Sequence, residues 1–346
     1  MLVAKYKKHV LNFNTPAGTS RGVLKEKNSW FLYIWDTDKP NIMGIGECSI
    51  IPKLSIDNPI KIEKILHALC DDINNYTLYH SFLKEDFPSI YFALEMALLD
   101  LKNGGKSIYF DSEFSRGEIG IPINGLIWMG TEEYMKTQMI DKINQFSCIK
   151  MKIGAISFEK ELSIIKWLRK TYGYDFELRL DANGAFSLNN VDEILSILSE
   201  YNIHSIEQPI KQGQWNEMAK LCKRSPIPIV LDEELIGINS SEDKINLLNK
   251  INPDYIILKP SLLGGFEASN EWITLAELRG IKWWITSALE SNIGLNAIAQ
   301  WCSTYKNKLP QGLGTGSIYS NNIDSLLEVK NGFLFYNAKN NVDVYY

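Results

Sequence analysis

The chain has 346 residues, of which 45% are hydrophobic and 22% are charged, and a formal net charge of −5. This composition is that of a globular protein, and the length is sufficient for a large core and two domains. The net negative charge and the lack of any apolar run of about 18 residues argue against nucleic acid or a membrane as a partner. The N-terminus has no signal-peptide pattern, and five scattered cysteines fit reduced thiols, so we expect a cytoplasmic protein.

Residues 1–118 differ from the rest of the chain and predict a small α+β domain. Strands at about 2–13 and 29–36, followed by MGIGECS, suggest an antiparallel sheet. The apolar run IYFALEMALLDLKNG then predicts a helix that stops at Gly104 and Gly105, because glycine readily adopts the conformation that ends a helix. The tail at about 317–346 contains EVKNGFLFYN, whose strand character indicates that it completes this domain.

Residues 119–316 alternate between β-rich runs and amphipathic helical stretches, which predicts an α/β domain. The candidate strands lie at residues 121–127, 148–154, 176–182, 204–209, 227–233, 255–260 and 282–288, with a poor eighth strand at or before GLGTG (312–316). Eight strands with helices between them is the count of a TIM-type (β/α)7β barrel. A doubly wound sheet stays possible, because periodicity alone does not show closure. Polar residues at the end of almost every strand favour the barrel, in which all strand ends ring one mouth.

Three acidic residues follow apolar runs at nearly even intervals: Asp181 in ELRLDANG, Glu207 in IHSIEQP and Asp232 in IPIVLDEE. From Lys152 through these acids to Lys259 the steps are 29, 26, 25 and 27 residues. One strand and its returning helix consume about that length, so the five groups are expected at the same ends of neighbouring parallel strands. Three carboxylates between ammonium groups describe a metal site. Because the histidines are dispersed, Mg²⁺ suits the site better than a transition metal.

Lys150 and Lys152 are two residues apart in a strand and therefore share one face, whereas Met151 faces the other way. Two adjacent ammonium groups near a metal ion lower a lysine pKa, so that one amine can abstract a proton near neutral pH. A substrate carboxylate on the metal would make the adjacent carbon acidic, and the opposite lysine would stabilise the enediolate. The sequence therefore points to an enzyme that abstracts a proton next to a carboxylate.

Two polar neighbours of Asp181 are further candidates. Asn183, two residues later, shares its direction and is expected to support it. Arg179, two residues earlier, lies on the same face deeper in the barrel and needs an anion, which is either one of these acids or a substrate carboxylate. Each feature also has a simpler explanation by itself, as an edge-strand lysine pair, a helix cap or a solvated loop acid. It is the joint pattern on consecutive units that favours a site.

Several motifs resemble those of the enolase superfamily, in its muconate-lactonizing subgroup, and most closely the o-succinylbenzoate synthase family. The matching segments occur in the expected order over about residues 44–316 and include GIGECSIIPKLS, IKMKIG, RLDANGAF, IEQPI, LDEE, ILKPSLLGG, TSALESNIG and GLGTG. The resemblance implies a barrel with a capping domain. It also implies that Mg²⁺, for which Mn²⁺ may substitute, is bound by Asp181, Glu207 and Asp232.

The resemblance further implies that Lys152 is the base and then the acid, that Lys259 is the opposing cation, and that Lys150 contacts the substrate carboxylate. The implied reaction is the dehydration of 2-succinyl-6-hydroxy-2,4-cyclohexadiene-1-carboxylate to o-succinylbenzoate, a step of menaquinone biosynthesis. Capping loops at about 14–30 and 47–57 are expected to close the mouth. The implied substrate contacts are Gly264 (with Gly265 offering N–H groups), Ser287, Gly314, Arg21 and Ile51–Pro52. Arg179 is a further candidate substrate contact because of its position in the strand.

Other readings stay open. An N-acylamino acid racemase or dipeptide epimerase would use Lys152 and Lys259 as acid and base on the two sides of the substrate. The dipeptide option is weakened because GLGTGSIYS has no acidic residue before Asp324. A catalytically idle barrel is disfavoured because all six charged residues are present. A nucleotide-dependent oxidoreductase, and with it a nucleotide cofactor, is disfavoured because an early GxGxxG after a first strand is missing.

Overall fold

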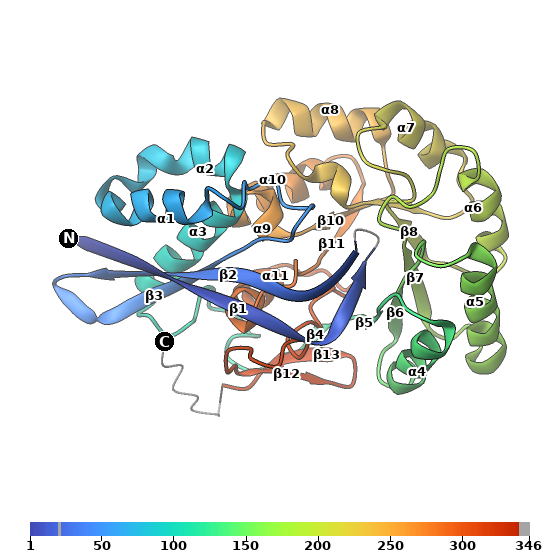
Figure 1. The fold of residues 1–346 in the computed structure, drawn as a ribbon, viewed down its shortest axis with the longest axis horizontal. Helices are drawn as coiled ribbons and strands as arrows, with labels where there is room; N and C mark the ends of the chain where they lie inside the picture. Colours follow the sequence, from blue (N-terminus) through green and yellow to red (C-terminus); the bar gives the residue numbers. More distant parts are fainter. Residues whose placement is uncertain (20–21, 339–346) are drawn as a thin grey trace.

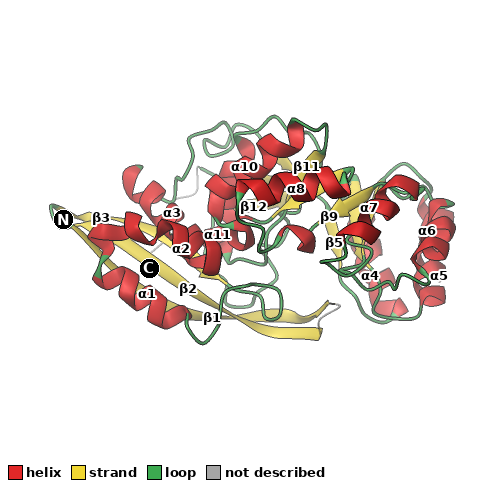
Figure 2. Ribbon diagram, turned by 90° about the horizontal axis from the view of Figure 1, so that it is seen from above, coloured by secondary structure: helices red, strands yellow, loops and turns green. Residues whose placement is uncertain are grey.

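The computed structural model describes residues 1–19 and 22–338. The N-terminal part is a three-stranded antiparallel sheet, with strand order β1-β2-β3, covered on one face by helices (Figures 1 and 2). Its elements are β1 (Leu2–Thr19), β2 (Gly22–Asp36), β3 (Lys39–Ser49), α1 (Ile62–Asp71), the 3-10 helix η1 (Ile73–Tyr79), α2 (His80–Asp86) and α3 (Pro88–Lys102).

The first two strands are longer than the sequence predicted. Pairing continues past a bulge after Asn12 to the tip of the hairpin, where Ala17 pairs with Leu24 and Gly18 with Val23. The segment expected as a capping loop at about 14–30 is therefore mostly strand, because backbone pairing continues where the apolar alternation has already faded. Arg21 lies outside the described residues.

Helix α3 joins the two parts of the molecule. It ends as predicted, with Gly104 and Gly105 in the left-handed region at φ values of 96° and 67°. Two glycines of β3 let it pack against the sheet at close range. A Cβ atom at Gly46 would lie 1.9 Å from the carbonyl oxygen of Ala93, and one at Gly44 would lie 2.0 Å from that of Ala97. The motif GIGEC is thus required for packing.

The second part is a parallel sheet of seven strands, ordered β5-β6-β7-β8-β9-β10-β11 and wrapped by helices (Figure 1). The strands are β5 (Gly125–Ile127), β6 (Cys148–Lys152), β7 (Glu177–Asp181), β8 (Ser205–Glu207), β9 (Ile229–Leu231), β10 (Tyr255–Leu258) and β11 (Lys282–Ile285). The helices are α4 (Glu132–Ile143), α5 (Phe158–Tyr172), α6 (Val191–Ser199), α7 (Trp215–Arg224), η2 (Glu233–Leu235), α8 (Ser241–Ile251), α9 (Pro260–Leu263), α10 (Gly265–Glu277) and α11 (Asn292–Ser303).

The segment Gln311–Gly312 closes this sheet into a barrel. Gln311 forms a parallel bridge with Ile123 on one side, and Gly312 forms one with Thr286 on the other. The Gly312 amide donates to the Ile285 carbonyl at 2.8 Å, and the Asn124 amide donates to the Gln311 carbonyl at 3.0 Å. The prediction of a β/α barrel with a short eighth strand and an N-terminal α+β domain is confirmed, and the doubly wound alternative is wrong.

The C-terminal tail contacts both parts. Strand β13 (Phe333–Tyr336) pairs with β12 (Leu327–Lys330) on one side and with β4 (Ile121–Pro122), at the start of the barrel region, on the other. Just before them, the Asn14 amide donates to the Ile318 carbonyl at 2.8 Å, and the Ser320 amide donates to the Asn12 carbonyl at 2.9 Å. The tail therefore reaches the first sheet through residues 317–321 rather than through its strands. The division into domains 1–118 and 119–316 stays a prediction, and residues 339–346 lie outside the described part.

The core is continuous through the barrel, its helices and the inner side of the N-terminal sheet, with a second cluster between that sheet and α1–α3. Among the described residues, no helix combines the length and the apolar character needed to cross a bilayer. All five cysteines have free thiols.

A buried carboxylate in the capping domain gives a testable pH dependence of stability. Asp57 accepts hydrogen bonds from the amide and hydroxyl of Ser89, at 3.1 and 2.5 Å, at the start of α3. Burial raises the pKa of Asp57 to about 6, although the bonds from Ser89 oppose the shift. The folded state therefore holds a proton more tightly than the unfolded chain, and this contribution to stability is lost as the pH rises from about 4 through about 6.

We expect the Asp57→Asn variant to lack this loss. Its free energy of unfolding, measured by urea denaturation, should gain up to about 3 kcal/mol relative to the wild type between pH 4 and pH 7.5, from a shift of about two pKa units. A difference between the two proteins that is constant over this range would show that Asp57 ionises as easily in the folded protein as in the unfolded chain.

Candidate active site

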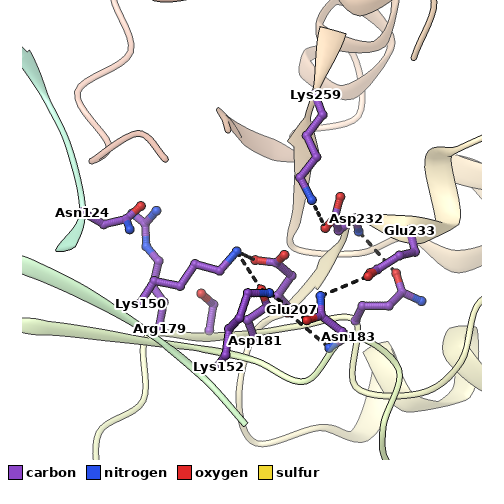
Figure 3. Close-up of polar contacts among 12 residues, drawn as sticks. Asn124, Lys150, Lys152, Arg179, Asp181, Asn183, Glu207, Asp232, Glu233 and Lys259 are labelled. Carbon is purple, nitrogen blue, oxygen red and sulfur yellow. Dashed lines mark hydrogen bonds and ion pairs between the residues drawn. The ribbon is translucent and has the colours of Figure 1, made fainter. Parts of the chain in front are cut away.

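Three carboxylates meet at the carboxyl ends of adjacent barrel strands (Figure 3). Asp181 ends β7, Glu207 ends β8, and Asp232 directly follows β9. The strand register places Lys152 beside Asp181 and Asp181 beside Glu207. All three carboxylates are buried. The parallel sheet thus brings together residues separated by about 25 positions, as the even spacing predicted.

Lysine ammonium groups contact these carboxylates from two sides. Lys150 Nζ lies 2.9 Å from Asp181 Oδ2 and 2.5 Å from Glu207 Oε2. Lys152 Nζ donates to the same Asp181 oxygen at 2.8 Å, so both lysines lie on the inner face of β6. Lys259 approaches from the opposite side and donates to Asp232 Oδ2 (Figure 3).

The charges of this cluster depend on one another. Burial disfavours ionisation of Asp181, but Lys150 and Lys152 hold its pKa well below the usual range. Burial likewise opposes the charge on Lys150 and on Lys259, yet the surrounding carboxylates keep both pKa values above normal. The lowered pKa expected for one lysine of the pair Lys150 and Lys152 beside a bound metal ion stays a prediction. Burial, together with repulsion from Asp181, raises the pKa of Glu207.

The donor set suits a hard divalent cation. Within the described residues, no three Asp, Glu, His or Cys side chains already surround one point as metal ligands, because lysines contact the carboxylates. Glu207 Oε1, however, is buried and has no hydrogen-bond partner in the described part of the chain. A buried oxygen without a partner is unfavourable, and three mutually repelling carboxylates on adjacent strands are the ligands that Mg²⁺ prefers. The residues present fit the ion.

Asn183 connects Lys152 to a residue that the sequence analysis missed. Its Oδ1 accepts from Lys152 Nζ at 2.7 Å, and its Nδ2 donates to Glu233 Oε1 at 3.0 Å. Its backbone has a φ of 46°, a left-handed conformation that asparagine tolerates well. Glu233 follows Asp232 in the motif LDEE, and this adjacency was the available signal.

A cavity of about 390 Å³ opens above the cluster, a volume suited to a small molecule. The capping domain lines it with Gly22–Leu24 and Ile51–Leu54. Among these described lining residues, Lys53 carries the charge. The barrel side is formed by Asn124, Leu126, Trp128, Lys150, Lys152, Asp181, Asn183, Glu233, Lys259, Thr286–Leu289, Gly312, Gly314 and Thr315. Ser287 and Gly314, predicted from the resemblance, therefore lie at the cavity.

The strand 121–127 contributes a polar side chain that the sequence analysis did not single out. Asn124 is 5% exposed, and its Oδ1 has no hydrogen-bond partner among the described residues. It lies near Lys150 and two residues before Leu126, which also lines the cavity (Figure 3). The available signal was the alternation of the two strand faces, which places Asn124 on the same face as Leu126. A search for alternating apolar residues passes over a polar residue on that inner face.

The structure does not bring Arg179 to the cavity lining formed by the described residues. Its guanidinium lies deeper in the barrel, where Nε donates to Glu177 Oε1 at 2.6 Å and Nη1 donates to the Pro310 carbonyl at 2.8 Å. It also lies 4.1 Å from the ring centroid of Trp284. The anion that this buried arginine requires is thus Glu177, and the expected substrate contact is corrected to a structural ion pair.

Gly264 is also absent from that lining. Directly after this turn, the amides of Phe266 and Glu267 donate to Glu95 of α3, at 2.6 and 3.2 Å. These two N–H groups therefore point toward the capping domain and not into the cavity. A Cβ atom at Gly265 would lie 1.8 Å from Glu95 Oε2. Gly265 therefore allows Glu95 of α3 to approach the start of α10, whereas Gly264 supplies the left-handed conformation, with a φ of 88°, between α9 and α10. The expected contact of Gly264 with substrate is corrected accordingly.

Comparison with known proteins gives concordant matches. The enolase C-terminal domain-like family matches residues 134–339. An o-succinylbenzoate synthase from Desulfotalea psychrophila (strain LSv54) is 46% identical over 95% of this chain and 97% of its own length. A hydrophobic dipeptide epimerase from Enterococcus faecalis (strain V583) is 26% identical over 72% of this chain and 67% of its own length.

Solved structures share the whole fold. The crystal structure of MenC from Desulfotalea psychrophila LSv54 has a TM-score of 0.85 and 42% identity, covering 96% of this chain and 99% of that one. A substrate-liganded L-Ala-D/L-Glu epimerase from Bacillus subtilis has a TM-score of 0.82 at 18% identity, covering 96% and 95%, and shows the common fold alone. By the family match over more than half of its length and by its 46% identity to a relative, the chain belongs to the enolase superfamily of enzymes.

Proposed function

We propose that this enzyme is a carbon–oxygen lyase that converts 2-succinyl-6-hydroxy-2,4-cyclohexadiene-1-carboxylate to o-succinylbenzoate by syn elimination of water. The observation that carries this proposal is the 46% identity to an o-succinylbenzoate synthase across 95% of the chain. The reaction would serve menaquinone biosynthesis. Free cysteine thiols support a reducing compartment such as the cytoplasm.

Asp181, Glu207 and Asp232 would hold Mg²⁺. When bound, the ion supplies positive charge opposite the negative charge that develops on the substrate carboxylate. The fit of these residues is supported by their burial and by the partnerless Oε1 of Glu207 in the described part of the chain. Mn²⁺ prefers similar oxygen ligands and is expected to substitute.

Lys152 takes the role of base. Its Nζ is fixed by Asp181 and Asn183 and faces the cavity, so it can remove the proton from the carbon next to the substrate carboxylate. In a syn elimination the hydroxide leaves from the same face, and the protonated Lys152 then donates its proton to it. One amine serves both steps.

Lys259 and Lys150 stabilise charge. Lys259 approaches the cluster from the side opposite to Lys152 and lines the same cavity (Figure 3). Its ammonium group would therefore lie against the other face of the substrate ring. Lys150 contributes a second cation beside the substrate carboxylate. Both amines keep raised pKa values among the carboxylates, which suits groups that act as fixed positive charges. Because the product is aromatic, proton abstraction is the barrier that these charges must lower.

A second candidate is the racemisation of N-acylamino acids or the epimerisation of dipeptides. The placement of Lys152 and Lys259 on opposite sides of the cavity favours it, since such reactions need one amine to remove a proton and another to return it. The epimerase from Enterococcus faecalis is more distantly related, at 26% identity.

An assay with three substrate classes separates these candidates. Purified enzyme is expected to form o-succinylbenzoate from the cyclohexadiene carboxylate with Mg²⁺ or Mn²⁺, and not after treatment with EDTA. N-succinylamino acids and dipeptides should react at least about tenfold more slowly, as judged by kcat/KM, which equals about 1.4 kcal/mol in transition-state stabilisation. Racemisation that dominates without aromatisation of the ring would transfer the proposal to the second candidate.

A further inference from the structure

The cavity wall that follows β11 contains an unfavourable backbone conformation. Ser287, Ala288 and Leu289 line the cavity, and Leu289 has a φ of 60°. This left-handed conformation is disfavoured for a residue with a Cβ atom and a bulky side chain. Such a conformation persists where the surrounding structure holds it in place, and it is often found at functional sites.

Two hydrogen bonds from distant parts of the chain hold Leu289. Its carbonyl oxygen accepts from Lys27 Nζ of β2 at 2.7 Å and from the Tyr319 hydroxyl, beyond the last barrel segment, at 2.7 Å. The Lys27 ammonium group also donates to Ser49 Oγ of β3. The ring of Tyr319 packs against Phe13 with 4.7 Å between the centroids. The capping domain, through Lys27, and the tail, through Tyr319, thus both donate to the Leu289 carbonyl.

Lys27 is an unusual residue at such a position, because it is only 1% exposed. A buried ammonium group needs nearby negative charge, which Glu47 and Glu290 provide. Glu290 also accepts from the Ala288 amide at 2.7 Å, and Glu47 accepts from the Ser291 amide at 2.9 Å. Both carboxylates therefore fix the segment on either side of Leu289 as well as neutralising Lys27.

We propose that Lys27 is a positioning residue that holds Leu289, at the end of the wall 287–289, in its left-handed conformation. The first residues of its own strand, Gly22–Leu24, form part of the capping side of the same cavity. One strand therefore lines the cavity at its beginning and fixes the facing barrel wall a few residues later. Lys27 does not belong to the lining formed by the described residues, so it acts on the substrate through Leu289. The identity of that substrate rests on the proposed function.

The test compares Lys27→Met with Tyr319→Phe, which removes one of the two bonds and keeps the ring. We expect KM to rise about tenfold in Lys27→Met and about threefold in Tyr319→Phe, in keeping with the loss of a charged and a neutral hydrogen bond, while kcat changes less than about threefold. Hydrogen–deuterium exchange should become faster in a peptide covering residues 286–291 in both variants. Lys25→Met, an exposed position on the same strand, is the control and should change neither quantity.

A double-mutant cycle distinguishes positioning from general destabilisation. Leu289→Gly lets the backbone adopt the left-handed conformation without strain. Adding Lys27→Met to that variant should raise KM by less than it does in the wild type. Equal effects in both backgrounds, a loss confined to kcat, or unchanged exchange at residues 286–291 would overturn the proposal. If Lys27→Met fails to fold, the same measurements of KM, kcat and exchange at residues 286–291 on Tyr319→Phe, alone and combined with Leu289→Gly, decide whether the proposal stands.

The exchange measurement needs no substrate. It therefore tests the positioning role even if the enzyme acts on N-succinylamino acids, in which case KM is measured with those compounds.

Discussion

The Lys152→Ala variant is expected to lose about 10³-fold or more in kcat, within the range attributed to a single general base. We expect no neighbouring amine to take over the task. Burial opposes the charge on Lys150, but Asp181 and Glu207 on either side of it keep its pKa raised, and Lys259 lies on the opposite side of the cluster. Steady-state kinetics on the cyclohexadiene carboxylate measure the loss.

The fold of this variant should stay intact. Lys152 is at the rim of the barrel and is only partly buried, so its removal leaves no large cavity in the core. Circular dichroism and Tm should match those of the wild type, and Mg²⁺ should still stabilise the protein. Lys170→Ala, at an exposed position of α5, serves as the matched control and should keep full activity. A Lys152→Ala enzyme that turns over at the wild-type rate would show that another group is the base.

The Glu207→Gln variant is expected to lose both turnover and its response to Mg²⁺. Glutamine keeps the shape of the side chain but removes the negative charge, and three carboxylates become two. A ligand that binds only the folded protein stabilises it by about 2.7 kcal/mol at 100 times its Kd. Scanning calorimetry should therefore show a Tm increase of several degrees for the wild type in excess MgCl₂, reversed by EDTA, and none for the variant.

A buried acid two residues after Asp232 provides the control for this effect. Glu234 accepts from the Gly213 amide at 2.7 Å and from Gln208 Nε2 at 2.9 Å, outside the cavity lining of the described residues. Glu234→Gln should therefore keep the Mg²⁺-induced rise in Tm, whatever its effect on basal stability. If Glu207→Gln retains the full rise, Glu207 does not bind the ion.

The local pattern was sufficient to predict the arrangement of the barrel and of its charged rim. Strand residues alternate between two faces, and each βα unit uses a similar length of chain, so evenly spaced polar residues at strand ends predict one convergent cluster. That is why Lys152, Asp181, Glu207, Asp232 and Lys259 could be named before the structure, and why the stop of α3 at its glycines was also correct.

Partners that come from distant segments could not be predicted in this way. Polar strand ends favoured barrel closure, but the partners of Gln311 and Gly312, which are Ile123 and Thr286, carry no sequence signal. Which anion pairs with Arg179, and which side chain accepts hydrogen bonds at the turn after Gly264, depend on how the elements pack together. The two partners are Glu177 and Glu95. The same holds for Lys27, which the sequence placed in a capping loop and which finds its partner only because β2 lies against the loop after β11. Periodicity encodes the direction of a side chain, whereas its partner depends on long-range packing, because the energy of a buried polar group is set by whatever surrounds it in space.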